Sequence, residues 1–189
     1  GLVTPVTVLL LELNRAPSFI IGSTAMIGNF SIFLFSSYTS KLIDRFGVKK
    51  ILIFGLFLWM LSALGHILWY IYPLLYLVKI IMGIGSTFIF ISTEVMINFY
   101  SDETNRGKNI GIYVVILSVG IAIGTLLIWT IELGNWVPYI IGATIVVGVI
   151  IMQMIILENI NLHEEKAEIV KMPIAKMSLM SLLAAAIYG

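Results

Sequence analysis

A stripe of polar and small side chains follows one apolar segment near the middle of the chain, residues 76–99. The stripe consists of Lys79, Gly83, Ser86, Phe90 and Glu94. Because these positions are three or four apart, a helix places them on one face. A charged side chain at the centre of a bilayer costs about 2.5–3.5 kcal/mol, so such residues are functional candidates by default. We expect Lys79, Ser86 and Glu94 to contact a solute or a coupling ion.

A simpler interpretation of the two charged residues stays open. Each lies only about six residues, or roughly 9 Å, from an end of its segment. Lys79 can extend its flexible stem toward the membrane surface. Glu94 can contact the polar loop that follows the segment.

The most charged stretch of the chain is KLIDRFGVKK, residues 41–50. Gly47 permits a left-handed turn between two helices. Lys49 and Lys50 lie at the amino end of the next apolar run, where a helix dipole disfavours cations. Attraction to lipid headgroups explains the basic residues of this stretch, but it does not explain Asp44.

The sequence carries no signature of catalysis or of metal binding. It contains no cysteine, no H-E-x-x-H, no G-x-S-x-G and no P-loop. His66 and His163 are too far apart in the topology to act together, and we expect His66 to be an interfacial residue rather than a proton relay. We therefore expect no enzymatic activity, no cofactor and no metal site, and a net charge of +1 gives no reason to expect a nucleic-acid partner.

The composition indicates that these residues are positioned by membrane-spanning helices. Hydrophobic residues make up 60% of the chain and charged residues 11%, and the mean hydropathy is +1.07, far from the usage of soluble domains. A strand of a membrane barrel would alternate polar and apolar residues, whereas the apolar runs of this chain are apolar at both odd and even positions. The complete spans are expected at residues 18–40, 51–72, 74–99, 110–131 and 137–157.

Both ends of the chain indicate a fragment of a larger protein. Residues 1–14 are apolar but too short to cross a bilayer, so we expect a partial first helix. Residues 177–189 are expected to begin a seventh helix. Residues 1–157 would then form one transmembrane bundle, and the polar stretch 158–176 would be a cytoplasmic linker between two bundles.

Basic residues predict the orientation of the spans. Counting the partial helix as the first, all of the following lie in loops 2–3, 4–5 and 6–7: Lys41, Arg45, Lys49, Lys50, Arg106, Lys108, Lys166, Lys171 and Lys176. The opposite side holds Arg15. Because short loops rich in Lys and Arg stay inside the cell, we expect these three loops to be cytoplasmic and the protein to cross the cytoplasmic (inner) membrane several times.

The stretch SKLIDRFGVKKIL, residues 40–52, resembles the loop 2–3 signature of the major facilitator superfamily (MFS), G-x-L-a-D-R-x-G-r-[RK]-x-x-[IL]. The matching residues are Asp44, Arg45, Gly47 and Lys49. In that family the loop carboxylate and its basic neighbours form a charge network with nearby helix ends and gate the cytoplasmic side. The resemblance implies a gate role for these four residues.

A second resemblance lies in the fourth helix. Residues 79–86, KIIMGIGS, resemble the superfamily pattern R-x-x-q-G-x-g-a, with Lys79 in place of the arginine. In drug/proton antiporters of the family that arginine is linked to proton coupling. Together with the stretch 93–113, the region 1–157 looks most like the uncharacterised YcaD-like branch of bacterial inner-membrane facilitators.

Three glycines are expected at contacts between helices. Gly120 and Gly124 form a small-xxx-small pair, which lets helices approach closely, and Gly83 lies in the stripe of the fourth helix. The antiporter signature has proline after the glycine pair, whereas Thr125 follows Gly124 here. This departure disfavours drug antiport.

These observations predict an all-α membrane protein with an MFS-type six-helix N-terminal bundle, in which helix 1 is truncated, helices 2–6 are complete and helix 7 begins. We expect a secondary active transporter that moves a small solute by alternating access, coupled to an ion or proton gradient. Its partners would be the solute, a proton, membrane lipid and the missing C-terminal six-helix half. The alternative is a membrane-embedded binding or sensor module, derived from a transporter half, that carries no flux.

Overall fold

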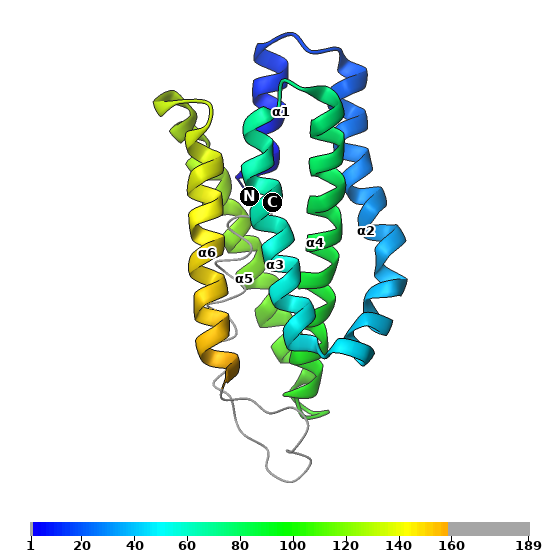
Figure 1. Cartoon of the computed structure of the whole chain (residues 1–189). Coiled ribbons are helices and arrows are strands. Elements are labelled where there is room, and N and C mark those ends of the chain that lie inside the picture. The colour runs from blue at the N-terminus through cyan, green and yellow to red at the C-terminus, as the bar shows by residue number, and fades with distance from the viewer. Residues whose placement is uncertain (1, 159–189) are drawn as a thin grey trace.

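The structure is a computed structural model that describes residues 2–158, with side chains described for 2–155 (Figure 1). The expected linker, apart from Glu158, and the expected start of a seventh helix at 177–189 lie outside the described residues. The α-helices are α1 (Val3–Leu13), α2 (Ser18–Phe46), α3 (Val48–Gly65), α4 (Tyr72–Phe99), α5 (Arg106–Leu126) and α6 (Val137–Glu158), and the short 3-10 helices are η1 (His66–Leu68) and η2 (Leu127–Leu133).

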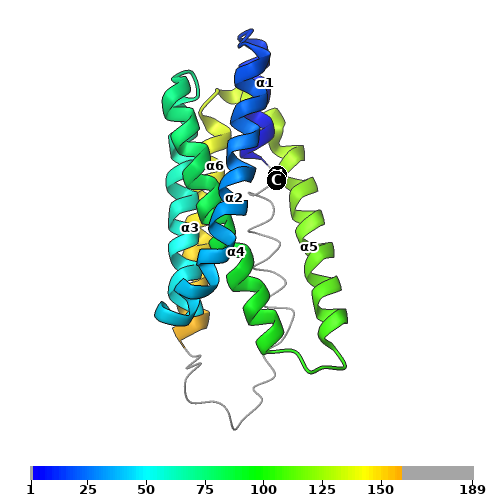
Figure 2. The ribbon, with the colours of Figure 1, turned by 90° about the vertical axis from the view of Figure 1, so that its right-hand side faces the viewer.

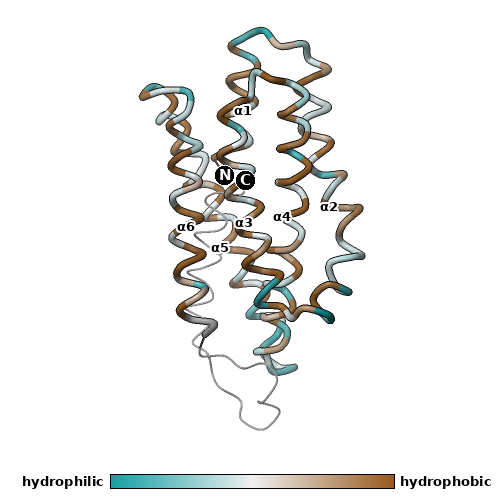
Figure 3. The backbone as a smooth tube through the Cα atoms, in the orientation of Figure 1, coloured by the Kyte–Doolittle hydropathy of each residue, from teal (hydrophilic) through white to brown (hydrophobic). Residues whose placement is uncertain are grey.

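The described part of the chain confirms the predicted all-α membrane fold. No strand occurs within residues 2–158. Five of its helical segments are long and apolar enough to cross a membrane, and α1 is a shorter apolar helix. Figure 3 shows hydrophilic residues gathered near the ends of the helices, with hydrophobic residues along most of their length between.

Successive helices run in alternating directions. The α2–α3 and α4–α5 connections lie with the end of α6 at the lower end of Figure 1, and the other three connections lie at the upper end. The turn at Gly47 and the basic start of α5 are therefore at the same end of the bundle. Because α2 and α4 both run from the upper to the lower end, they are parallel neighbours (Figures 1 and 2).

Several helices extend beyond the apolar runs that predict them. The α2 helix continues through the charged residues 41–46 and ends at Gly47, because lysine, leucine and arginine are good helix formers and glycine is the first residue that breaks the pattern. The α5 helix begins at Arg106, one turn before the apolar run. Hydropathy locates the part of a helix that lies in lipid, but the hydrogen-bonded helix continues into the polar region.

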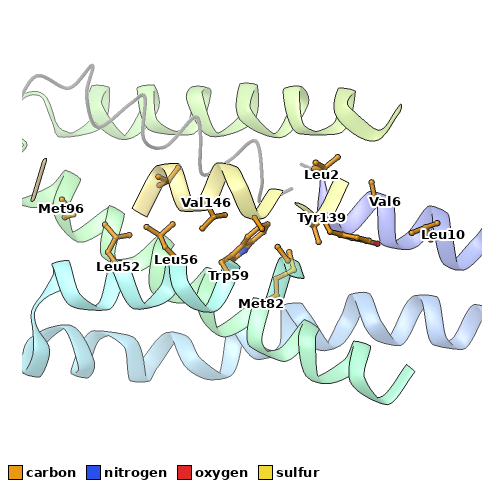
Figure 4. Close-up of a cluster of buried hydrophobic side chains, with 14 of the residues drawn as sticks. Leu2, Val6, Leu10, Leu52, Leu56, Trp59, Met82, Met96, Tyr139 and Val146 are labelled. Carbon is orange, nitrogen blue, oxygen red and sulfur yellow. The ribbon is translucent and has the colours of Figure 1, made fainter. Parts of the chain in front are cut away.

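The buried core joins α1, α3, α4 and α6 (Figure 4). Trp59 of α3 and Tyr139 of α6 are the two largest fully buried side chains. They are surrounded by aliphatic residues that include Leu2, Val6, Leu10, Leu52, Leu56 and Val146. The α4 helix packs extensively against α3 and α2, while α2 and α5 are the least buried of the spans.

Two glycines let α4 approach two neighbours at once. A Cβ atom on Gly83 would lie 2.5 Å from the carbonyl oxygen of Gly28 on α2, and a Cβ atom on Gly85 would lie 2.9 Å from that of Gly55 on α3. Both distances are far below ordinary van der Waals contact. The backbone of α4 therefore lies directly against both α2 and α3, as close packing through small residues allows.

Candidate functional site

A cavity of about 210 Å³ lies between α1, α2 and α4. It is lined by Thr4 of α1, by Ala25, Gly28, Asn29 and Ile32 of α2, and by Lys79, Met82, Gly83 and Ser86 of α4. The lining residues of α2 have the same relative spacing as those of α4, and in each helix the spacing of three, four and seven puts them on one face. Two parallel helices thus present matching faces to one cavity.

The close contact of Gly28 with Gly83 fixes the position of these faces. A Cβ atom on Gly28 would lie 3.7 Å from the backbone oxygen of Lys79, so the two helices remain close one turn away. The cavity lies seven to fourteen residues from the first residue of each helix, or roughly 10–21 Å along the axis. It is therefore well inside the spans.

Lys79 is buried in this cavity, with 4% of its surface exposed. Its Nζ donates a hydrogen bond of 3.4 Å to the Thr4 hydroxyl. The side chain does not extend to the membrane surface, so the simpler interpretation of this lysine does not hold.

No carboxylate described in the structure accompanies the Lys79 ammonium. The acidic residues with described side chains are all exposed and lie elsewhere on the chain, namely Glu12, Asp44, Glu94, Asp102, Glu103 and Glu132. A buried charge without a partner is costly. Lys79 therefore places a cationic group in the cavity, where it can bind an anionic partner.

Ser86 lines the cavity but its hydroxyl is engaged in packing. The hydroxyl donates to the carbonyl oxygen of Met82 at 2.6 Å and accepts from Nε1 of Trp59 at 3.2 Å. It therefore joins α4 to the core of α3 and has no hydrogen left for a ligand. The prediction that Ser86 contacts a solute or a coupling ion stays a prediction.

Glu94 does not belong to the same cavity. It is exposed on α4 and lies fifteen residues from Lys79, which corresponds to about 22 Å along the helix axis. The structure thus brings Lys79, Gly83 and Ser86 together and leaves Glu94 apart, in the last two turns of α4, which ends at Phe99.

The stretch around Gly47 forms a tight connection between α2 and α3. Gly47 has φ 86° and ψ 148°, a backbone region that is essentially restricted to glycine. Asp44 and Arg45 are exposed in the last turn of α2, and the Arg45 guanidinium lies 5.2 Å from the centre of the Phe46 ring. Lys49 lies partly buried at the start of α3. The described residues include no ion-pair partner of Asp44, so its place in a charge network stays a prediction.

His66 lies at the end of α3, and its predicted position at the membrane interface stays a prediction. The side chain is fully buried, and its ring stacks on the ring of Tyr139 at 5.9 Å between centroids. Its Nδ1 lies 2.8 Å from the carbonyl oxygen of Ser62. The Tyr139 hydroxyl is in turn hydrogen-bonded to the hydroxyl of Thr7 at 3.0 Å. The α6 helix packs against the end of α3 and covers the histidine. A hydropathy profile does not reveal such a contact.

The contributions of α1 and α2 to the cavity were not predicted from the sequence. Thr4 and Asn29 supply its other polar side chains, and Ala25 and Gly28 provide the space. The spacing of Ala25, Gly28 and Asn29 is a signal that was present in the sequence. It could be paired with the α4 stripe only once the two helices were known to be neighbours.

The remaining predicted packing residues lie on α5. Gly120 and Gly124 are two of its four buried residues, together with Asn109 and Tyr113. At the start of α5, Arg106 donates from Nε to the Asn98 side-chain oxygen at 2.6 Å. This bond links α5 to the end of α4.

Comparison with known proteins assigns the family. A model of the Major Facilitator Superfamily matches residues 1–188. The chain belongs to this superfamily. Family membership and the apolar helices of the described residues make it a multi-pass membrane chain, as the sequence predicts. The finer likeness to the YcaD-like branch stays a prediction.

The chain is also similar to a curated protein, the uncharacterised MFS-type transporter YfkF of Bacillus subtilis (strain 168). The two are 26% identical over 145 residues, which make up 77% of this chain and 37% of YfkF. The chain thus spans little more than a third of that relative's length. No solved structure matches the chain.

Proposed function

We propose that the full-length protein is a secondary active transporter that moves a small solute across the cytoplasmic membrane by alternating access. Membership in the superfamily supports transport as the general function. The single observation that carries the solute site is the cavity between α1, α2 and α4, in which a buried lysine has no carboxylate partner among the described residues. A charge retained inside a span marks a solute or ion pathway.

The two most exposed helices, α2 and α5, are the proposed contact surface for a second bundle. Because α2 and α5 are the least buried spans, they offer the largest free apolar surfaces for a second bundle. Exposed apolar residues on these two helices include Met26, Phe33, Val115 and Ile123. In the proposed mechanism the two bundles rock against each other around a solute held between them.

The loop around Gly47 is proposed as the cytoplasmic gate. Asp44, Arg45 and Lys49 surround a turn whose backbone conformation requires a glycine. The charges of the exposed Asp44 and Arg45 and of the partly buried Lys49 would contact helix ends of the second bundle. Gly47 would keep the charges in position. The basic residues of loops 2–3, 4–5 and 6–7 support a cytoplasmic location for this end of the bundle.

Coupling to a proton or ion gradient is proposed to involve Glu94 and Lys79. Both are ionisable groups within the α4 span, and their separation along the helix means that they act at different points of the pathway. Lys79 would contact the solute or the coupling ion in the cavity. Glu94 would respond to protonation near the cytoplasmic end.

Flux by the full-length protein in proteoliposomes tests this function. A panel of small solutes is offered with and without an imposed pH gradient. The proposal expects at least one solute to accumulate in a gradient-dependent manner. A protein that binds solutes but moves none of them across the bilayer would contradict it, and would instead fit a sensor.

A further inference from the structure

The chemistry of the cavity around Lys79 restricts the class of solute. The Lys79 ammonium has three N–H donors, and its single hydrogen bond among the described residues, to Thr4, is 3.4 Å long, beyond the roughly 2.7–3.2 Å of ordinary N–H···O bonds. At least two donors therefore have no protein acceptor in the described part of the chain. A ligand that pairs with these donors must supply hydrogen-bond acceptors and negative charge.

A second donor lies beside the lysine. Asn29 lines the same cavity, and its amide nitrogen is 3.4 Å from the carbonyl oxygen of Ala25, a long contact within its own helix. Its side chain is exposed, and the long contact with Ala25 leaves the amide available as a donor to a ligand. Since Ser86 has already donated its hydrogen to Met82, the donors that the cavity offers to an anion are Lys79, Asn29 and the Thr4 hydroxyl, which accepts from Lys79 and keeps its own hydrogen.

The lining also contains the apolar side chains of Ala25, Ile32 and Met82. A volume of about 210 Å³ admits a ligand much larger than one water, whose share of liquid volume is roughly 30 Å³. This volume suits one charged head and a short hydrocarbon chain. A phosphate carries close to two negative charges, whereas the lining supplies one cationic side chain, Lys79.

We infer that the cavity binds a small organic monocarboxylate, with its carboxylate at Lys79 and Asn29 and its aliphatic part against Ala25, Ile32 and Met82. This inference rests on the proposed transport function for its biological use, but it concerns binding alone. Lys79 bonds the carboxylate through a charge-assisted hydrogen bond, which is stronger than a neutral one. Binding also neutralises the buried ammonium, so the anion stabilises the folded protein.

The test uses the full-length protein in detergent and two pairs of probes. Potassium butyrate and potassium hexanoate are compared with butyramide and hexanamide, at constant pH and ionic strength. The amides keep the size and chain of the acids and lack the charge. The apparent melting temperature is recorded against probe concentration, because a ligand that binds only the folded state raises it.

We expect both carboxylates to raise the melting temperature of the wild type and the amides to have no effect. Lys79→Met should weaken the apparent affinity for the carboxylates by about tenfold or more, the factor that about 1.4 kcal/mol represents. Lys79→Arg should retain binding because it keeps the charge. Lys108→Met, the same change at an exposed position of α5, should behave as the wild type.

The inference is overturned if acids and amides stabilise the wild type equally or if neither stabilises it. It is also overturned if Lys79→Met binds the carboxylates as well as the wild type does. If Lys79→Met does not fold, two measurements still test the inference. One is the comparison of acid with amide in the wild type, and the other is carboxylate binding by Asn29→Ala, which should be weaker than in the wild type. Flux of the same labelled acids in proteoliposomes separates the two proposals. Binding without flux of any solute contradicts transport only, whereas flux of a neutral or cationic solute without carboxylate binding contradicts only this inference.

Discussion

Replacing Gly83 by alanine tests the close packing that positions the cavity. The added Cβ would lie 2.5 Å from the Gly28 carbonyl oxygen and 2.7 Å from the Cβ of Ser31. Neither atom is the end of a flexible side chain, so α2 must move by about 0.9 Å to restore a contact of 3.4 Å. Overpacking of this kind costs roughly 1–3 kcal/mol.

The helix propensity of alanine opposes this cost. Alanine in place of glycine in a helix interior gains about 0.5–1 kcal/mol, so Gly83→Ala should destabilise the protein by a net amount of about 0–2.5 kcal/mol. Gly148→Ala on α6 makes the same chemical change where nothing lies within 4 Å of the new Cβ. It gains the propensity without the clash, so the difference between the two variants isolates the packing term, about 1–3 kcal/mol.

Thermal denaturation of the full-length protein in detergent measures this difference. The apparent melting temperature should follow the order Gly83→Ala, Gly85→Ala, wild type, Gly148→Ala, from lowest to highest. Gly85→Ala is intermediate because its nearest contacts, 2.9 Å to the Gly55 oxygen and 3.1 Å to the Trp59 nitrogen, are less severe. A Gly83→Ala protein as stable as Gly148→Ala would refute the packing of α2 on α4, and with it the geometry of the cavity.

Three further predictions concern the charged and turn residues. Asp44→Asn in the full-length protein should impair transport while membrane insertion stays intact, and normal flux would remove the gate role. Glu94→Gln should change the pH dependence of transport, and an unchanged pH profile of the initial rate would rule out its part in coupling. Gly47→Ala should lower the apparent melting temperature through backbone strain of about 1–3 kcal/mol, because φ at this position is 86°. The new Cβ would meet nothing within 4 Å, so strain is the expected cause. Gly107→Ala is the control: its Cβ also meets nothing within 4 Å, but the residue is helical, so no loss of stability is expected.

The membrane-spanning helices could be predicted from the sequence because hydropathy alone determines which segments prefer lipid. The α4 part of the site could also be predicted, since Lys79, Gly83 and Ser86 share a face by spacing alone. The α2 part could not. Gly28 and Asn29 gain their meaning from the neighbouring α4, and the choice of neighbour depends on packing between segments that are distant in the sequence.

The placement of individual polar side chains was less predictable than that of helices. His66 lies near the end of an apolar run, where interfacial histidines are common, yet α6 covers it through Tyr139. Lys79 is a similar distance from the end of its own run and is also buried. Distance from a helix end fixes depth in the bilayer, whereas burial depends on which helix lies alongside.

Two-sided accessibility of the cavity tests the proposed mechanism most directly. The described chain has no native cysteine, so Ala25→Cys in an otherwise cysteine-free full-length protein gives one reactive site in the cavity lining. A membrane-impermeant maleimide is applied to right-side-out and to inside-out vesicles, with Lys50→Cys as a control that should react only from the cytoplasmic side. The account predicts that Ala25→Cys reacts from both sides and that Asp44→Asn shifts the ratio of the two rates. Reaction of Ala25→Cys from one side only would contradict alternating access.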